Sequence, residues 1–161
     1  MKNLILVRHA KSSWEFNVID HERPLNNRGI EDANLVSKHL IKEYIKIDQL
    51  VCSDAKRAKD TAKIFLSNLK INENIVSYNY DLYDFAGYNL IDFIKSCHDG
   101  IDDLMIFGHN HAITDFVNTY GDLLIDNVPT AGFVKIQFDV LHWNDIEQGK
   151  TVKTLFPRDL K

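Results

Sequence analysis

The chain has 161 residues, of which 45% are hydrophobic and 26% are charged, and its formal net charge is −4 at pH 7. This composition excludes a disordered chain, and the length predicts a single domain, residues 1–161, with a sizeable core. The negative charge argues against binding of duplex nucleic acid, which usually requires a basic excess. No apolar stretch approaches the roughly 18 residues of a membrane span. We therefore expect neither nucleic acid nor a membrane as a partner.

Two features of the sequence indicate where in the cell the protein is located. The apolar run near the N-terminus, residues 4–7, is too short for the core of a signal peptide. Cys52 and Cys97 lie among apolar residues and lack the spacing of a metal or redox motif. These features predict a cytoplasmic protein with reduced thiols.

The apolar run at residues 4–7 leads directly into Arg8, His9 and Lys11. An apolar run of this kind predicts a strand that is buried on both faces. Ligands of open α/β sheets bind at the carboxyl ends of the strands. Two cations and an imidazole at such an end indicate an anion site that contains a potential nucleophile. Taken alone, the segment fits ordinary solvated charges equally well.

A polar segment follows, and Asn26 or Asn27 is expected to cap the next helix. From Arg28 onward, apolar residues recur in steps of three and four, which predicts an amphipathic helix. These positions are Ile30, Ala33, Val36, Leu40 and Tyr44.

Residues 50–52 predict a second short strand, followed by Ser53 and Asp54, either of which can cap a helix. The expected inner face of this helix is formed by Ala55, Ala58, Ala62, Phe65 and Leu69. Arg57 lies in its first turn, beside backbone N–H groups that have no partner within the helix. Because helix N-termini favour anions, Arg57 is a second cation at a strand-to-helix corner.

Residues 75–78 predict an edge strand, and a short helix is expected around Leu90, Ile94 and Cys97. Residues 104–107 predict a third buried strand, and Gly108 and His109 follow it at once. His109 is therefore expected at the carboxyl end of a strand, as is His9.

The pattern changes after Pro129, because residues 134–138 alternate between apolar and polar side chains. This alternation predicts a half-buried strand, which residues 151–156 can join as a hairpin. The predicted fold is α/β, a three-layer α/β/α sandwich whose sheet is mainly parallel with an antiparallel C-terminal end. The order of the strands does not follow from the sequence.

The residues expected at the strand ends are suited to phosphoryl transfer. Arg8 and Arg57 carry planar charged groups that fit phosphoryl oxygens, and His9 and His109 supply nitrogen groups that titrate near neutral pH. The chain has no Gly-rich Lys loop of the kind that binds nucleotides with Mg²⁺. His109 and His111 resemble a metal pair but lack a third ligand at a recognisable spacing. We expect no metal and no other cofactor.

Several motifs, in order along the chain, resemble the histidine phosphatase superfamily, the phosphoglycerate-mutase-like group. Within that group the chain is most similar to the small SixA-type phosphohistidine phosphatases, and the resemblance covers essentially its whole length. The motifs are Arg8–Trp14, Asp20–Gly29, Ser53–Ala62, Gly108–Asn110, Pro129–Ala131, Trp143 and Phe156–Pro157.

The resemblance implies that His9 is the phosphorylated nucleophile and that Arg8, Arg57 and His109 hold the phosphoryl group. Lys11 is a further candidate for substrate binding, although an exposed lysine is an equally good interpretation. His111 stands where the family commonly has proline, and we interpret it as a helix-start residue.

The general-acid glutamate of the mutases has no clear match in this chain. Only Asp81 and Asp84 lie in the corresponding region, and both are interpreted as loop carboxylates or helix caps. A phosphorylated imidazole leaves easily without a strong acid, because its pKa is about 6.5. The short segment between Tyr78 and Asp103 also leaves little chain to form a lid. Both points favour phosphohistidine displayed on a protein as the substrate.

The predicted function is a metal-independent phosphatase that works through a phosphohistidine intermediate, on a phosphorylated protein or small phosphorylated substrate. Two alternatives remain open. One is a small-molecule phosphomonoesterase or mutase, and the other is a non-catalytic phosphoprotein-binding module on the same fold.

Overall fold

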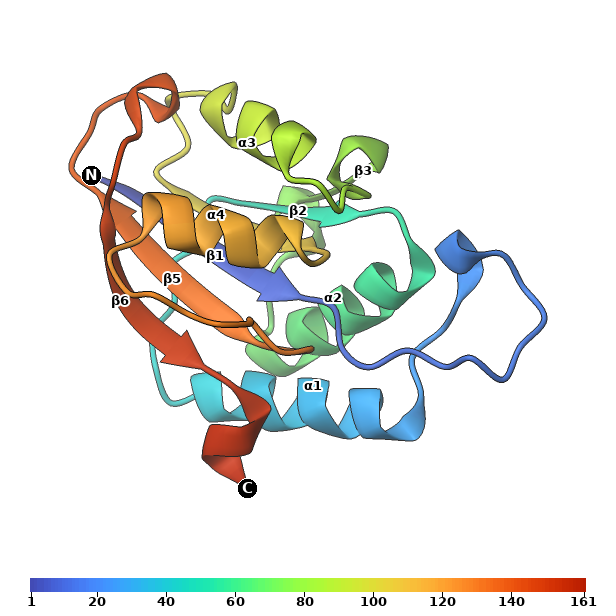
Figure 1. The fold of residues 1–161 in the computed structure, drawn as a ribbon. Coiled ribbons are helices and arrows are strands. Elements are labelled where there is room, and N and C mark those ends of the chain that lie inside the picture. The colour runs from blue at the N-terminus through green and yellow to red at the C-terminus, as the bar shows by residue number, and fades with distance from the viewer.

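All 161 residues are described by a computed structural model. Six strands form one sheet in the order β3-β2-β4-β1-β5-β6. The first four strands of this order are mutually parallel, and β5 runs antiparallel to both of its neighbours, β1 and β6 (Figure 1). The strands are β1 (Lys2–Arg8), β2 (Gln49–Ser53), β3 (Val76–Asn79), β4 (Asp103–Gly108), β5 (Phe133–Phe138) and β6 (Lys150–Leu155). The predicted α/β class, the edge strand and the C-terminal hairpin are all confirmed.

Helices cover both faces of the sheet, which confirms the three-layer arrangement (Figure 1). α1 (Asn27–Leu40) and α2 (Lys56–Leu69) pack on one face, and α3 (Tyr88–Lys95) and α4 (Ala112–Tyr120) pack on the other. Each face has its own buried apolar cluster. None of the helices has the length and apolar character needed to cross a membrane.

The central strand β1 explains why the site forms where it does. Leu4 and Leu6 pack into the cluster beneath α3 and α4, whereas Ile5 and Val7 pack into the cluster beneath α1 and α2. Strand side chains alternate between faces, so both clusters need apolar residues from β1. The prediction of a strand buried on both faces is confirmed, and its carboxyl end leads directly into His9.

The helix α1 differs in part from its prediction. The Asn26 side chain caps it by accepting a hydrogen bond from the Gly29 N–H, so Asn26, rather than Asn27, is the predicted cap that the structure confirms. The helix ends at Leu40, however, and the predicted inner-face residues Ile30 and Tyr44 are exposed. Polar residues that periodicity overlooks, including Asp32, complete the buried face; Asp32 is paired with Lys161 at 2.9 Å.

The predicted cap of α2 is wrong. The residue at the N-cap is Ala55, and no side chain caps the helix. Ser53 and Asp54 instead bond to two histidines, His109 and His21. Local sequence cannot show this, because both histidines come from distant parts of the chain.

Candidate active site

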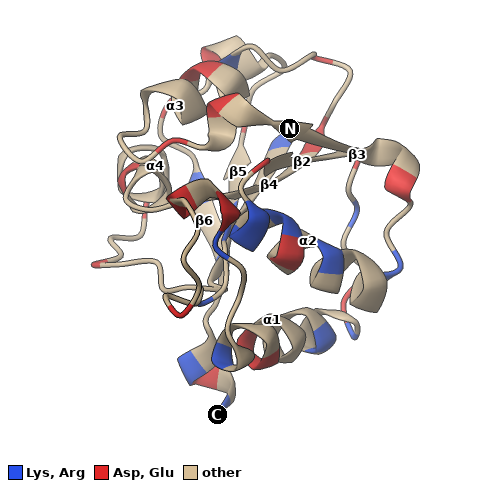
Figure 2. Cartoon of the chain, turned by 90° about the vertical axis from the view of Figure 1, so that its right-hand side faces the viewer, with Lys and Arg blue, Asp and Glu red and all other residues tan.

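The sheet order brings the predicted site residues together. β1 and β4 are adjacent and parallel, with Arg8 opposite Gly108, so His9 and His109 follow the ends of neighbouring strands. The His9 N–H donates to the Gly108 carbonyl at 3.0 Å, and the two imidazole ring centroids are 5.1 Å apart. Arg57 reaches the same place from the first turn of α2, where basic residues gather (Figure 2).

These residues meet at a pocket of about 570 Å³. Arg8, His9, Lys11 and Arg57 all line it, and His109 does not line it but packs against the ring of His9. The side chain of Lys11 is exposed at the pocket. The structure thus places every residue of the predicted site at one location.

His9 is held as a neutral ring with one free nitrogen. It is only 8% exposed, and its Nδ1–H donates to the Ala10 carbonyl at 2.7 Å. A carbonyl can only accept, so this bond leaves the lone pair on Nε2. Burial lowers the pKa of His9 to about 3, and the charges of Arg57 and Arg8 act in the same direction. From the sequence, His9 is expected to titrate near neutral pH, and burial is the main reason that its pKa is lower in the folded chain.

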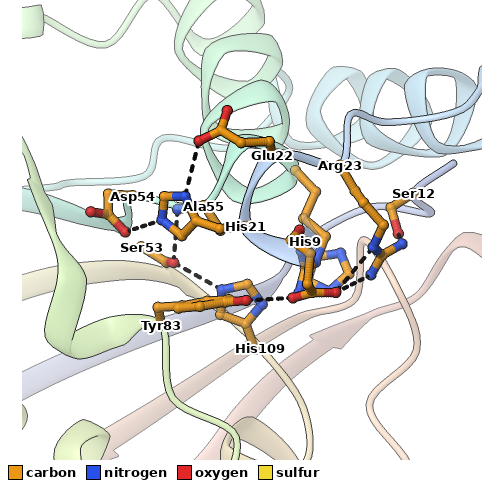
Figure 3. A network of polar contacts seen from close by, with 12 residues as sticks. His9, Ser12, His21, Glu22, Arg23, Ser53, Asp54, Ala55, Tyr83 and His109 are labelled. Atoms are coloured by element: carbon orange, nitrogen blue, oxygen red, sulfur yellow. Dashed lines mark hydrogen bonds and ion pairs between the residues drawn. The ribbon is translucent and has the colours of Figure 1, made fainter. Parts of the chain in front are cut away.

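His109 is also neutral. Burial lowers its pKa to about 2, with further lowering by His9 and Arg57. Its Nε2 shares a hydrogen bond of 2.8 Å with Ser53 Oγ, and the Ala55 N–H donates to that same oxygen at 3.2 Å (Figure 3). Ser53 therefore positions the ring of His109 from the end of β2.

The two arginines are fixed by the surrounding chain. Arg8 Nη1 donates to the Val128 carbonyl at 2.9 Å. Arg57 is 2% exposed, and its Nη1 and Nη2 donate to the backbone and side chain of Asp20 at 2.7 and 2.9 Å. The Nε atoms of both arginines and Nδ1 of His109 are buried and make no hydrogen bond. Buried groups of this kind normally have a partner.

Asp20 is a site residue that the sequence argument missed. Its carboxylate accepts hydrogen bonds from Arg57 and Arg23, and from the hydroxyl of Tyr83. Burial by itself raises the pKa of Asp20, but the bonds from Tyr83 and Arg57 outweigh it and hold the pKa well below its usual range. The available signal was its place in the quoted motif at residues 20–29, three residues before Arg23.

Neither of the two aspartates in the region of the missing general acid, Asp81 and Asp84, lines the pocket. Asp84 Oδ2 accepts from the N–H groups of Gly87 and Leu90 at 3.1 Å and so caps α3. Asp81 is exposed. The interpretation of Asp84 as a helix cap is confirmed.

The segment that carries Asp81 and Asp84 contributes aromatic rings to the site rather than carboxylates. Tyr83 and Phe85 present their rings edge-on to His109, at centroid distances of 5.3 and 5.2 Å. His21, to which the sequence argument gave no role, packs against Tyr83 at 4.9 Å. Its hydrogen bond to Asp54 raises its pKa. No group of three or more His, Cys, Asp or Glu side chains is arranged to hold a metal ion.

Residues 4–79 match the histidine phosphatase superfamily (branch 1), a span that includes Arg8, His9 and Arg57. Over this span the chain is similar to the superfamily. The match supports phosphatase activity on a phosphorylated substrate. An uncharacterised protein of Mycobacterium tuberculosis is 29% identical to the chain over 153 residues, which cover 89% of the chain and 93% of that protein. An uncharacterised protein of Mycobacterium leprae is 32% identical over 112 residues, covering 67% of the chain and 66% of that protein.

Solved structures share the fold of this chain. The protein histidine phosphatase SixA complexed with tungstate superposes with a TM-score of 0.82, at 15% identity and with 99% of both chains covered. A mycobacterial glucosyl-3-phosphoglycerate phosphatase has a TM-score of 0.63 at 13% identity, covering 95% of this chain and 98% of that one. The fold is thus of the SixA type, and solved phosphatases named for different substrates share it.

Proposed function

We propose that the chain is a metal-independent phosphatase that forms a phosphohistidine at His9 and acts on protein phosphohistidine in the cytoplasm. The observation that carries this proposal is the state of His9. Its ring is neutral, its Nε2 keeps a lone pair, and the buried Arg57 and the half-buried Arg8 stand beside it. A neutral imidazole is a nucleophile, and fixed cations stabilise the charge that develops on a transferring phosphoryl group.

In the first step, Nε2 of His9 attacks the phosphorus and the bond from phosphorus to the substrate nitrogen breaks. The substrate imidazole leaves and takes a proton from solvent. Water then attacks the phosphorus of phosphorylated His9, which releases inorganic phosphate and restores the neutral ring. Arg8, Arg57 and His109 hold the phosphoryl oxygens in both steps, and Lys11 supplies a further cation at the pocket. The Nε atoms of Arg8 and Arg57 and Nδ1 of His109 have no hydrogen-bond partner in the protein, so they are suited to hold phosphoryl oxygens.

The substrate class follows from the leaving group. Asp84 caps a helix, Asp81 is exposed outside the pocket, and Asp20 is ionised by its arginine partners. None of them is placed to donate a proton to an alkoxide. An imidazole needs no strong acid, because it is protonated easily near neutral pH. Protein phosphohistidine therefore fits the site better than an alkyl phosphate.

A small-molecule phosphomonoesterase or mutase is the second candidate, because the fold is shared with a glucosyl-3-phosphoglycerate phosphatase. One experiment separates the candidates. The purified protein is mixed with a ³²P-phosphohistidine protein and, in parallel, with alkyl phosphates, and acid-labile label on the enzyme is measured after rapid quenching. We expect label on the wild type but not on His9→Ala, and a higher kcat/KM for phosphohistidine. A higher kcat/KM for an alkyl phosphate would establish the second candidate, and binding without any turnover would indicate a binding module.

A further inference from the structure

Large apolar side chains are exposed in and next to the active-site pocket. The segment 14–19, which follows β1, leaves Trp14 79% and Ile19 71% exposed, and Phe16 is exposed between them. It forms a loop that projects beyond the end of β1 (Figure 1). Tyr80 and Phe85, from a later part of the chain, are exposed as well. We call these five residues the apolar rim.

The apolar rim is continuous with the pocket. Trp14 and Phe85 line the pocket itself, together with His9. A second hollow, lined by Phe16, adjoins the pocket and shares with it the residues Ser13, Glu15 and Asn26. A third, of about 450 Å³, is lined by Ile19 and Tyr80 and shares Asp20 with the pocket. Each of the two hollows beside the basic centre is therefore lined in part by exposed apolar side chains.

Two rings of the rim are held in place. The guanidinium of Arg23 lies 3.6 Å from the ring centroid of Trp14, and Arg23 is itself fixed by Asp20. The ring of Phe85 packs against His109 at 5.2 Å. Rigid aromatic side chains supply much of the binding energy of protein interfaces, since little entropy is lost when they are covered.

We propose that the apolar rim is a docking surface for a protein that presents its phosphorylated side chain among apolar residues. This inference rests on the proposed function. Charge complementarity favours it, because the phosphoryl dianion matches Arg8 and Arg57 while apolar neighbours of that side chain match the rim. A small phosphorylated metabolite is polar and does not cover the apolar rim, which then stays exposed to water. Covering the rim also excludes water from the reacting phosphoryl group, which strengthens its contacts with the arginines.

The test compares two phosphohistidine peptides of equal length and charge. One carries Leu and Phe beside the phosphohistidine, and the other carries Ser at the same positions. The quantity measured is the ratio of their kcat/KM values for the wild type, Phe16→Ser and Ile19→Ser. The matched controls are Leu124→Ser and Leu141→Ser, which remove exposed apolar residues that line none of the three hollows.

We expect the wild type to prefer the apolar peptide by about tenfold, on the order of one good interface anchor. The ratio of the two kcat/KM values should fall towards one in Phe16→Ser and Ile19→Ser and stay at the wild-type value in both controls. Equal kcat/KM values for the two peptides in the wild type, or an equal loss in the controls, would overturn the docking surface. Rim-dependent binding to vesicles of phosphatidylcholine and phosphatidylglycerol without any peptide preference would also overturn it, in favour of a membrane. Failure of the proposed function is distinguishable, because neither phosphohistidine peptide would then be hydrolysed by any of the variants or by the wild type.

Discussion

Acidification from about pH 7.5 to about pH 5 is expected to destabilise the fold through its two site histidines. In the folded state the pKa of His9 is about 3 and that of His109 is about 2, whereas an unfolded histidine titrates at about 6.5. Between these values the unfolded state binds more protons than the folded state. The free energy of unfolding must therefore fall as the pH falls through this range.

The magnitude follows from the size of the shift. At about pH 5 the unfolded ring lies about 1.5 units below its pKa, and each unit corresponds to about 1.4 kcal/mol. Each buried histidine thus contributes a loss of about 2 kcal/mol. His21 opposes this loss in part, because its raised pKa stabilises the fold below the unfolded pKa and that stability is lost as the pH rises. The loss of unfolding free energy on acidification is therefore best compared between the wild type and a variant that lacks one of the buried histidines.

Urea denaturation of the wild type and of His9→Gln at both pH values measures this difference. The variant should lose about 2 kcal/mol less than the wild type on acidification, since it lacks one of the two buried rings. His39→Gln serves as the control, because its side chain is exposed on α1, and it should lose as much as the wild type. An equal pH effect in His9→Gln and the wild type would show that His9 titrates alike in both states, which would refute the neutral buried nucleophile.

Three further outcomes test the site. His9→Ala should lower turnover by ~10⁴-fold or more and leave the free energy of unfolding at pH 7.5 within about 1 kcal/mol of wild type; steady-state kinetics with more than about one per cent residual activity would contradict its role. Arg57→Ala should cost about 2–4 kcal/mol of transition-state stabilisation, measured as kcat/KM, while EDTA should change nothing; reactivation by added Mg²⁺ or Zn²⁺ would speak against the metal-free mechanism. Asp84→Asn should reduce stability by about 1 kcal/mol in urea denaturation, because it weakens the cap of α3, and should lower phosphohistidine hydrolysis less than tenfold; a larger kinetic loss would make Asp84 the acid.

Local patterns in the sequence determined much of the fold. The apolar run before Arg8 predicted a strand buried on both faces, and the alternation after Pro129 predicted the strand β5. Residues 104–107 predicted the strand before His109. These predictions succeed because burial and backbone periodicity act over a few residues. The roles of the site residues stay predictions, as does the single-domain interpretation.

Tertiary structure alone decided how the predicted pieces combine. The neighbouring positions of β1 and β4 place His9 beside His109, and no local pattern specifies that pairing. Ser53 was expected to cap a helix but bonds to His109, a partner 56 residues away. Asp20 had no assigned role until the fold brought Arg57 and Arg23 to its carboxylate. The depth of burial that keeps His9 neutral likewise depends on the whole fold, because desolvation is a sum over everything packed around the ring.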